Sequence, residues 1–357
     1  MSITVSALPP PGDAAAVPPP SGAAGVRRRG PVIPLRYAVG RVAGALVSML
    51  AVVVTGFFLF RVVPGDPVRA LTRGRAVDAA QLAALRHQFG IDKPLIAQFG
   101  DYTARIARGD LGTSYQYKTS VSALIGSHVW ATVYLVGTAT LIAAFLGLRI
   151  GVRSAWKHGS RADRANTGIA LVLWSMPTFW LALILIVVFG VGFGPIPGMF
   201  PTGGMSSPNV HGLFPSVWDH FRHLVLPCVT LVAVLYAQYL LTMRATLLEE
   251  VGADYLTTAR AKGLREDDVR RKHAVPNAML PAVTLVFLNL GTAVSGSILA
   301  ETIFSWPGLG SLFYEALTVP DQPLLEGLFI FFAAAVIAMN LLAELLYPIL
   351  DPRVRTS

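Results

Sequence analysis

The stretch LVLPCVTLVAVLYAQYLLTM, residues 224–243, runs for twenty residues without a charged side chain. An α-helix rises about 1.5 Å per residue and the hydrocarbon core of a bilayer is about 30 Å thick, so about twenty apolar residues cross it. Nothing in this stretch would force a charge into lipid. The stretch therefore predicts a transmembrane helix.

Five further stretches share this character. They cover residues 42–60, 129–148, 167–194, 277–300 and 327–343, and the last continues past Glu344 through Leu345. Hydrophobic residues make up 54% of the 357-residue chain and charged residues 14%, whereas soluble domains carry about 25% charged residues. Six uncharged runs of this length are not expected of helices buried in a soluble protein. The sequence thus predicts an all-α membrane protein with six transmembrane helices.

The remaining segments divide the chain around these helices. Residues 1–34 are rich in Pro and Ala and predict a disordered cytoplasmic tail. We expect the first transmembrane helix over residues 35–63, and no small-residue cleavage site follows it. A long extracytoplasmic loop is expected over 64–128, a five-helix core over 129–350 and a cytoplasmic C-terminus over 351–357. Helical spacing within the long loop predicts short amphipathic helices around Leu82, Leu85 and Phe89 and around Ile96, Phe99 and Ile106.

The positive charges predict the orientation of the helices. Lys and Arg in short loops mark the cytoplasmic side. Five precede the first helix, five lie between the second and third, seven lie in residues 244–278, and two follow the sixth helix. The third loop holds only Arg222 and the fifth holds none. Both termini are therefore predicted to be cytoplasmic, and the eight positive charges of the long loop 64–128 weigh little, since long loops translocate largely regardless of charge.

The loop 244–278 carries the most informative pattern. Its sequence DYLTTARAKGLR, residues 254–265, continues to PNAMLP, residues 276–281. We expect a short helix, a break at Gly263, a second helix, and Pro281 in the first turns of the fifth span. We call this segment the basic hairpin. Such a hairpin could transmit a push from a separate motor domain, or it could be a solvated loop whose charges only set the topology.

This loop resembles the EAA loop of binding-protein-dependent ABC importer permeases. The similarity rests on residues 259–263, with Pro281 eighteen positions after the glycine, and Thr257-Thr258-Ala259 stands where the family has Glu-Ala-Ala. Further similar segments are GDLG at 109–112, ETIFSWPGLG at 301–310 and LDPR at 350–353. The resemblance covers roughly residues 35–357 and is strongest to the first permease subunit of dipeptide or oligopeptide importers.

The resemblance implies a type I (MetI-like) permease fold within a complex in the cytoplasmic (inner) membrane of a bacterium. The expected partners are a paralogous permease, two ABC ATPase subunits, an extracytoplasmic substrate-binding protein and membrane lipid. The implied solute is a di- or oligopeptide, with nickel, glutathione or another small solute as alternatives. The implied contact with the ATPase involves Asp254, Tyr255, Thr258, Ala259, Arg260, Ala261, Lys262, Gly263 and Pro281.

The chain itself is not expected to be an enzyme. No Gly-x-x-x-x-Gly-Lys-Ser/Thr motif occurs in it, so we expect ATP and Mg to bind in the partner ATPase subunits and no cofactor in this chain. The net charge of +9 follows the predicted topology, so no nucleic-acid partner is expected. A secondary transporter would favour inverted repeats and ionisable residues at mid-membrane, and an intramembrane enzyme would need a nucleophile or metal motif. The sequence clearly shows neither the features of a secondary transporter nor those of an intramembrane enzyme.

Polar residues in and beside the spans are the remaining candidates. Asn289, Thr292 and Ser295 recur at three-residue spacing in the fifth span and would line a pore or hydrogen-bond neighbouring helices. Glu301 and Trp306 are candidates for an external gate or a contact with a binding protein, and for Trp306 we favour the lipid headgroup region instead. Asn340 and Glu344 share a face of the sixth span. His211, His220, His223 and Asp219 would bind metal or lie at the membrane interface, and we expect the interface and no metal site.

Overall fold

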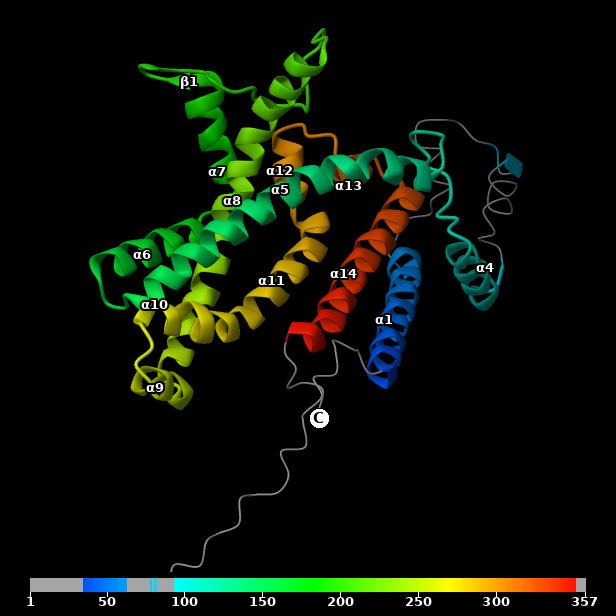
Figure 1. The fold of residues 1–357 in the computed structure, drawn as a ribbon. Helices are drawn as coiled ribbons and strands as arrows, with labels where there is room; N and C mark the ends of the chain where they lie inside the picture. The colour runs from blue at the N-terminus through cyan, green and yellow to red at the C-terminus, as the bar shows by residue number, and fades with distance from the viewer. Residues whose placement is uncertain (1–34, 63–77, 79, 82–92, 351–357) are drawn as a thin grey trace, which may run out of the picture. The chain divides into compact units, whose positions relative to one another are not determined.

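The computed structural model describes residues 35–62, 78, 80–81 and 93–350 (Figure 1). The predicted tail 1–34, the C-terminal residues 351–357 and the helix predicted around Leu82, Leu85 and Phe89 lie outside the described residues. The second predicted short helix is present as α4, Leu95–Ala107.

The described residues are predominantly helical. The elements are α1 (Leu35–Val62), α4 (Leu95–Ala107), α5 (Val121–Trp156), α6 (Arg161–Ser175), α7 (Thr178–Leu185), the π-helix η1 (Ile186–Val191), β1 (Gly192–Phe193), β2 (Ile196–Pro197), α8 (Leu213–Val251), α9 (Asp254–Ala261), α10 (Glu266–Asp268), the π-helix η2 (Val269–Ala274), α11 (Val275–Gly296), α12 (Ile298–Ile303), α13 (Leu309–Thr318) and α14 (Gln322–Leu350). The two short strands pair antiparallel as a hairpin.

Five helical segments are long and apolar enough to cross a membrane. They are Leu35–Phe60, Val121–Trp156, Leu213–Val251, Glu266–Gly291 and Gln322–Leu346. The third predicted span, residues 167–194, is not one straight helix. Its residues belong to the pair Arg161–Ser175 and Thr178–Val191, which is bent by 100°. The described residues therefore provide six membrane segments when this pair counts as one.

A proline causes the break between α6 and α7. Pro177 restricts the residue before it, and Met176 has the extended angles φ −76° and ψ 128°. Pro177 also lacks the amide hydrogen that a continuing helix would use, and it stands immediately before the first residue of α7. Hydropathy alone passes over this break, because Met and Pro are both uncharged.

The most extensive helix–helix contact in the bundle is the one between α5 and α8. Gly147 and Gly151 of α5 lie against the α8 backbone, where a Cβ at Gly147 would come within 2.9 Å of the Tyr236 oxygen and one at Gly151 within 2.8 Å of the Leu240 oxygen. This is the small-xxx-small arrangement that lets membrane helices approach closely. Any larger residue at these positions would push α5 and α8 apart.

A second helix pair is formed by α1 and α14, which lie side by side (Figure 1). Phe57 of α1 packs in a cluster with Tyr102 of α4 and Ile330 of α14. At the far end of the pair, Arg41 Nη1 lies 3.1 Å from Glu344 Oε1, and the Tyr37 hydroxyl donates to the Glu344 carbonyl oxygen at 3.0 Å. The carboxylate of Glu344 therefore joins the first and last membrane helices.

Candidate functional site

The basic hairpin begins where α8 ends. Helix α9 follows Val251, turns at Gly263, and returns through α10 and η2 into α11 (Figure 1). Leu256 and Ala259 are the buried residues of α9, and their three-residue spacing places them on one helical face. That face packs on Leu247 of α8 and Val269 of η2. Movement of α9 is thus mechanically linked to the membrane helices α8 and, through η2, α11.

Gly263 terminates α9 in the left-handed region. Its φ is +77°, a conformation that costs other residues about 1–2 kcal/mol. Its amide donates to the Arg260 oxygen at 2.9 Å, and the Leu264 amide donates to the Ala259 oxygen at 3.3 Å. These bonds satisfy carbonyls that the helix end would leave open. The glycine is required here by backbone angle and not by space, since a Cβ at this position would have no neighbour within 4 Å.

Polar side chains close the hairpin. Arg260 Nε lies 2.9 Å from Glu266 Oε1 across the turn. The Tyr255 hydroxyl donates to the Glu250 carboxylate at the end of α8 and accepts from Asn277 Nδ2 at 2.9 Å. Tyr255 therefore links α8, α9 and α11 at one point.

The outer face of α9 presents small and polar side chains. Asp254, Thr257, Thr258, Ala261 and Lys262 are exposed. Ala259 and Leu256 face inward instead, so Ala259 supports the fold of the hairpin and is not part of its exposed surface. Pro281 lies in the second turn of α11 and is exposed.

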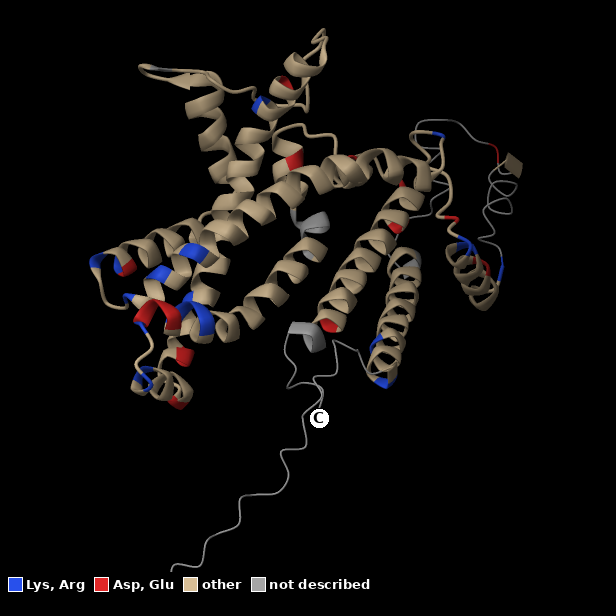
Figure 2. Ribbon diagram, in the orientation of Figure 1, with Lys and Arg blue, Asp and Glu red and all other residues tan. Residues whose placement is uncertain are grey.

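A partly buried ion pair lies at the same end of the bundle. Arg244 of α8 donates from Nε to Asp163 Oδ1 at 2.7 Å and from Nη2 to Oδ2 at 3.0 Å. Asp163 is 2% exposed, and its own amide donates to Ser160, which caps α6. Figure 2 shows Lys and Arg gathered around this end, on α6, α9 and η2. The sequence does not reveal the pair because its members are 81 residues apart, although Ser160-x-x-Asp163 is the pattern of a helix start.

Glu301 lies buried in a different region, between α5, α12 and α13. Its Oε1 accepts from Thr132 Oγ1 at 2.8 Å and from Ser297 Oγ at 2.7 Å. Its Oε2 accepts from the amides of Gly310 at 2.7 Å and Ser311 at 3.2 Å. We call these five residues the Glu301 cluster. The carboxylate occupies the position where the first turn of α13 needs acceptors and favours negative charge.

The segment after Glu301 is packed as tightly as the carboxylate itself. A Cβ at Gly308 would lie 2.3 Å from Glu301 Oε2, and one at Gly310 would lie 2.7 Å from the Ile298 Cα. Trp306 is fully buried and donates from Nε1 to the Ala131 oxygen at 2.9 Å. Glu301 and Trp306 therefore hold α5, α12 and α13 together from inside. Neither side chain is exposed to the lipid headgroups or to an external partner in this structure.

Of the three fifth-span candidates, the structure describes the side chain of Asn289. Asn289 of α11 is buried and donates from Nδ2 to Gln238 Oε1 of α8 at 3.2 Å, a bond between two membrane helices. Thr292 and Ser295 belong to α11, and their side chains lie outside the described residues.

Two of the histidines predicted in the third loop, His220 and His223, bond to nearby backbone. His220 Nδ1 lies 2.7 Å from the Ser216 oxygen and His223 Nδ1 lies 2.9 Å from the Asp219 oxygen. Asp219 accepts from the amide and hydroxyl of Ser207 at 2.6 and 2.8 Å. Within the described ranges, no group of three His, Cys, Asp or Glu residues could hold a metal ion.

A third buried carboxylate, that of Asp321, lies just before the last helix. Asp321 accepts from Ser114 Oγ at 2.5 Å, from the Gln116 amide at 2.9 Å and from the Leu324 amide at 3.3 Å. An Asp just before a long apolar helix is a recognisable cap in the sequence, but its bond to Ser114, 207 residues away, is visible only in the structure.

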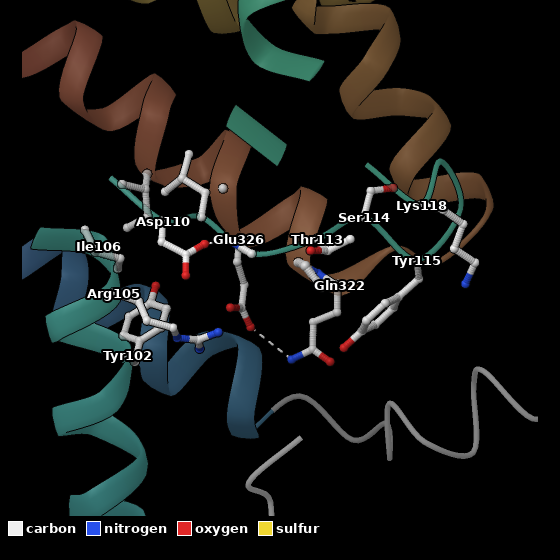
Figure 3. A pocket seen from close by; sticks show the side chains of 15 residues that line it. Tyr102, Arg105, Ile106, Asp110, Thr113, Ser114, Tyr115, Lys118, Gln322 and Glu326 are labelled. Carbon is white, nitrogen blue, oxygen red and sulfur yellow. Dashed lines mark hydrogen bonds between the residues drawn. The ribbon is translucent and has the colours of Figure 1, made fainter. Parts of the chain in front are cut away.

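Next to this cap lies a cavity of about 430 Å³ between α4, the segment 110–118 and the start of α14 (Figure 3). Arg105, Asp110, Lys118 and Glu326 are its charged lining residues, and Ile106, Leu111 and Ile330 are among its apolar ones. Nearby, burial raises the pKa of Tyr117 to about 12, and the Glu315 carboxylate acts in the same direction. The Tyr117 hydroxyl donates to the Glu315 carboxylate.

Comparison with known proteins covers nearly the whole described chain. The model of binding-protein-dependent transport system inner membrane components matches residues 145–356, and the model of the N-terminal part of such membrane components matches residues 34–136. A putative peptide permease protein of Brucella ovis is 37% identical over 325 residues, which cover 90% of this chain and 100% of the relative. The dipeptide transport system permease protein DppB of Escherichia coli K12 is 34% identical (90% and 99% covered). The glutathione transport system permease protein GsiC of Pectobacterium atrosepticum is 35% identical (90% and 99% covered).

Proposed function

Because this chain belongs to the family of binding-protein-dependent transport system inner membrane components, we propose that it is the pore-forming permease subunit of an ATP-driven importer of di- and oligopeptides. The peptide class is supported by the similarity to the Brucella permease and to DppB. Glutathione is the second candidate solute, because GsiC is similar to the same extent over the same share of the chain.

The basic hairpin is the proposed contact with the ATPase. One observation carries this assignment: α9 presents an exposed face where the short side chains of Thr257, Thr258 and Ala261 lie between Asp254 and Lys262, while its opposite face is anchored by Leu256 and Ala259 against α8 and η2. A small-residue face allows close approach of a partner groove, and a rigid anchor transmits the displacement to the spans. Asp254, Thr258, Ala261 and Lys262 would touch the ATPase.

Force applied to α9 has a structural route into the bundle. Leu256 contacts the cluster that includes Met243 and Leu247 of α8 and Ala278 and Ala282 of α11. Helix α8 in turn packs on α5 over the close approach at Gly147 and Gly151. A shift of α9 would therefore move α8, α11 and α5 together rather than bend a single helix.

The proposed complex lies in the cytoplasmic membrane with both termini and the basic hairpin in the cytoplasm. The concentration of Lys and Arg at the hairpin end supports this orientation (Figure 2). A paralogous permease would complete the pore, two ABC ATPase subunits would supply ATP hydrolysis, and a substrate-binding protein would deliver solute from outside. No role in ATP hydrolysis is proposed for this chain, since it has no phosphate-binding loop motif.

Purification of the tagged chain from its native membrane tests the proposal. We expect a second permease and ATPase subunits to co-purify, and the reconstituted complex with its binding protein to take up labelled peptide only with ATP. Transport by the chain as a homo-oligomer, without ATPase subunits, would contradict the proposal and favour a secondary transporter.

A further inference from the structure

Five exposed cations surround the turn between α5 and α6. Arg149 and Arg153 lie near the end of α5, Lys157 is its C-cap, and Arg161 and Arg164 lie at the start of α6. We call these five residues the turn cations. Figure 2 shows Lys and Arg gathered at this end of the bundle. Within the part of the chain that the structure describes, none of the five forms an ion pair with a carboxylate.

The basic hairpin treats its charges differently. The preference of Lys and Arg for the cytoplasmic side accounts for positive charge in both loops, but the hairpin balances part of that charge with its own carboxylates. Three of its cations have a carboxylate oxygen within 2.9 Å: Arg260 with Glu266, Arg270 with Asp267, and Lys272 with Asp268. The unbalanced charge at the α5–α6 turn is therefore a separate feature of the surface.

The single acidic residue of this segment does not neutralise the turn cations. Asp163 is the only Asp or Glu between positions 149 and 164. Its buried carboxylate accepts from Arg244 at 2.7 and 3.0 Å and from the Gly159 amide at 2.9 Å. Asn166 Nδ2 also donates to Ser154 Oγ at 3.2 Å between the two helices. These bonds fix the turn and hold its negative charge inside the fold, while the turn cations stay at the surface.

Local helix stability gives no reason for the two cations that begin α6. Arg161 is the first residue of the helix, and Arg164 follows three residues later. A helix N-terminus carries a partial positive charge, so a cation there is unfavourable and an anion is stabilised. The start of α6 and the turn cations therefore both favour a bound anion.

One face of α5 changes from apolar to cationic along its length. Ile142, Phe145 and Leu146 are exposed, and Arg149 and Arg153 follow on the same face at helical spacing. The Arg149 guanidinium carbon lies 4.9 Å from the centre of the Phe145 ring. Because α5 is long and apolar enough to cross a membrane, its exposed apolar side chains face acyl chains. The change at Arg149 then marks the depth at which lipid headgroups begin.

Helix α6 repeats this arrangement from the end that the turn joins. Arg161 and Arg164 share a face with Val172 at helical spacing, and Val172 is 61% exposed. Ile169, close to this face, is also exposed. Both helices thus present cations beside the turn and exposed apolar side chains farther along.

A ligand that satisfies both parts of this surface has a negative headgroup and acyl chains. An inorganic anion would contact only the cations, and a neutral lipid would leave them without a counter-charge. Basic clusters at the cytoplasmic ends of membrane helices commonly bind anionic headgroups. We propose that the turn cations bind an anionic phospholipid, with its phosphate at Arg149 and Arg153 and an acyl chain along Phe145.

An acidic surface of a partner protein is the competing occupant. Lipid is favoured because the cationic and apolar residues form one continuous face of α5, and the apolar part lies within a membrane segment. In the proposed orientation the site faces the cytoplasmic leaflet. The inference needs only that α5 crosses a membrane, so it does not depend on the transported solute.

Lipid binding to the full-length chain, purified with its co-purifying subunits in neutral detergent, tests the site. The probe is fluorescent phosphatidylglycerol. We expect the double substitution Arg149→Gln and Arg153→Gln to weaken its binding about tenfold or more. The matched control, Lys262→Gln with Arg271→Gln, removes two exposed cations from the basic hairpin and should change binding less than about twofold. Equal losses in the two variants would overturn the proposal, since net charge alone would then explain the binding.

A charge-preserving variant separates recognition from local damage. Arg149→Lys with Arg153→Lys keeps both charges, and Lys also binds phosphate. This variant should bind phosphatidylglycerol much more tightly than the Gln variant does. If the two variants bound equally weakly, the positive charge would not be what holds the lipid, and the proposal would fail.

Two competitors identify the kind of ligand. Phosphatidylcholine with the same acyl chains should displace the probe at least about tenfold less well than phosphatidylglycerol, because its headgroup has no net charge. Glycerol phosphate, which lacks acyl chains, should not displace the probe at a hundredfold excess. Equal displacement by either competitor would refute an anionic phospholipid site.

Recovery of the ATPase subunits distinguishes the competing occupant. If the Gln variant lost these subunits but bound phosphatidylglycerol as the unaltered chain does, the turn cations would be a protein contact and the lipid site would be refuted. None of these measurements reads peptide uptake, so the lipid site can fail while the import function stands, and the reverse.

Discussion

The basic hairpin and the Glu301 cluster both depend on glycine and charge, but for opposite reasons. Gly263 has φ +77° and open space around it. At Gly308, in contrast, an added Cβ would lie only 2.3 Å from the Glu301 carboxylate. The ion pair of Arg260 and Glu266 lies at the surface, whereas Glu301 is fully buried and accepts four hydrogen bonds. One region exposes a rigid surface to a partner, and the other fixes helices internally. Similar residue types therefore do not indicate similar roles.

Replacement of Glu301 should have the largest effect. Glu301→Leu leaves the donors of Thr132, Ser297, Gly310 and Ser311 without their acceptor, and each unsatisfied buried group costs about 1–3 kcal/mol. We expect at least about 3 kcal/mol of destabilisation, seen as lost yield and a lowered melting temperature in detergent.

The control is Glu315→Leu, which removes an exposed carboxylate from α13. It should change the melting temperature far less, although it also removes the bond from Tyr117. Equal losses in the two variants would show that the Glu301 cluster is not the stronger structural element.

A pair of substitutions in α9 separates fold from contact. Ala259→Trp overfills a buried position, which typically costs about 1–3 kcal/mol, and should lower the melting temperature and stop transport. Ala261→Trp lies on the exposed face and should leave the melting temperature unchanged. We expect it to abolish peptide uptake in proteoliposomes and to reduce co-purification of the ATPase. Normal uptake in Ala261→Trp would refute the assigned contact face.

Substitution of Gly263 tests whether the backbone angle, and not the space around it, requires a glycine. Gly263→Ala should cost about 1–2 kcal/mol, the cost of the left-handed conformation. Gly263→Asn should cost less, because Asn tolerates that region better. Hydrogen exchange of the Leu264 amide, followed at increasing denaturant concentration, measures the stability of the hairpin in both variants. If both variants were as stable as the unaltered chain, the angle would not matter.

The smallest effect is expected at the surface ion pair. Arg260→Ala should change stability by at most about 1 kcal/mol, since exposed pairs contribute little. Melting temperatures of the unaltered chain and of Arg260→Ala, measured at low and at high salt, check this prediction. The difference between the two proteins should shrink at high salt. A loss comparable to that of Glu301→Leu would erase the contrast between the two regions.

Several features were predictable from local patterns. Uncharged runs of about twenty residues marked five continuous spans and the apolar part of the bent pair. The spacing of Ile96, Phe99 and Ile106 predicted α4, and Gly263 predicted the end of α9. Each of these depends on neighbouring residues only.

Other features required residues far apart in the chain. The inward position of Ala259, the burial of Trp306 and the bond from Asn289 to Gln238 follow from how helices pack on one another. The bend at Pro177 was present in the sequence but was hidden by uniform hydropathy.

The sequence by itself determined the membrane class, the number of apolar segments, the position of the basic hairpin and the family resemblance, because lipid burial and backbone angle act on short stretches. Only the tertiary structure decided which groups each charged side chain meets. Asp163 meets Arg244, Asp321 meets Ser114, and Arg105 shares a cavity with Glu326. A carboxylate takes a structural role according to the donors that the fold brings within hydrogen-bond distance, and sequence separation does not reveal those donors.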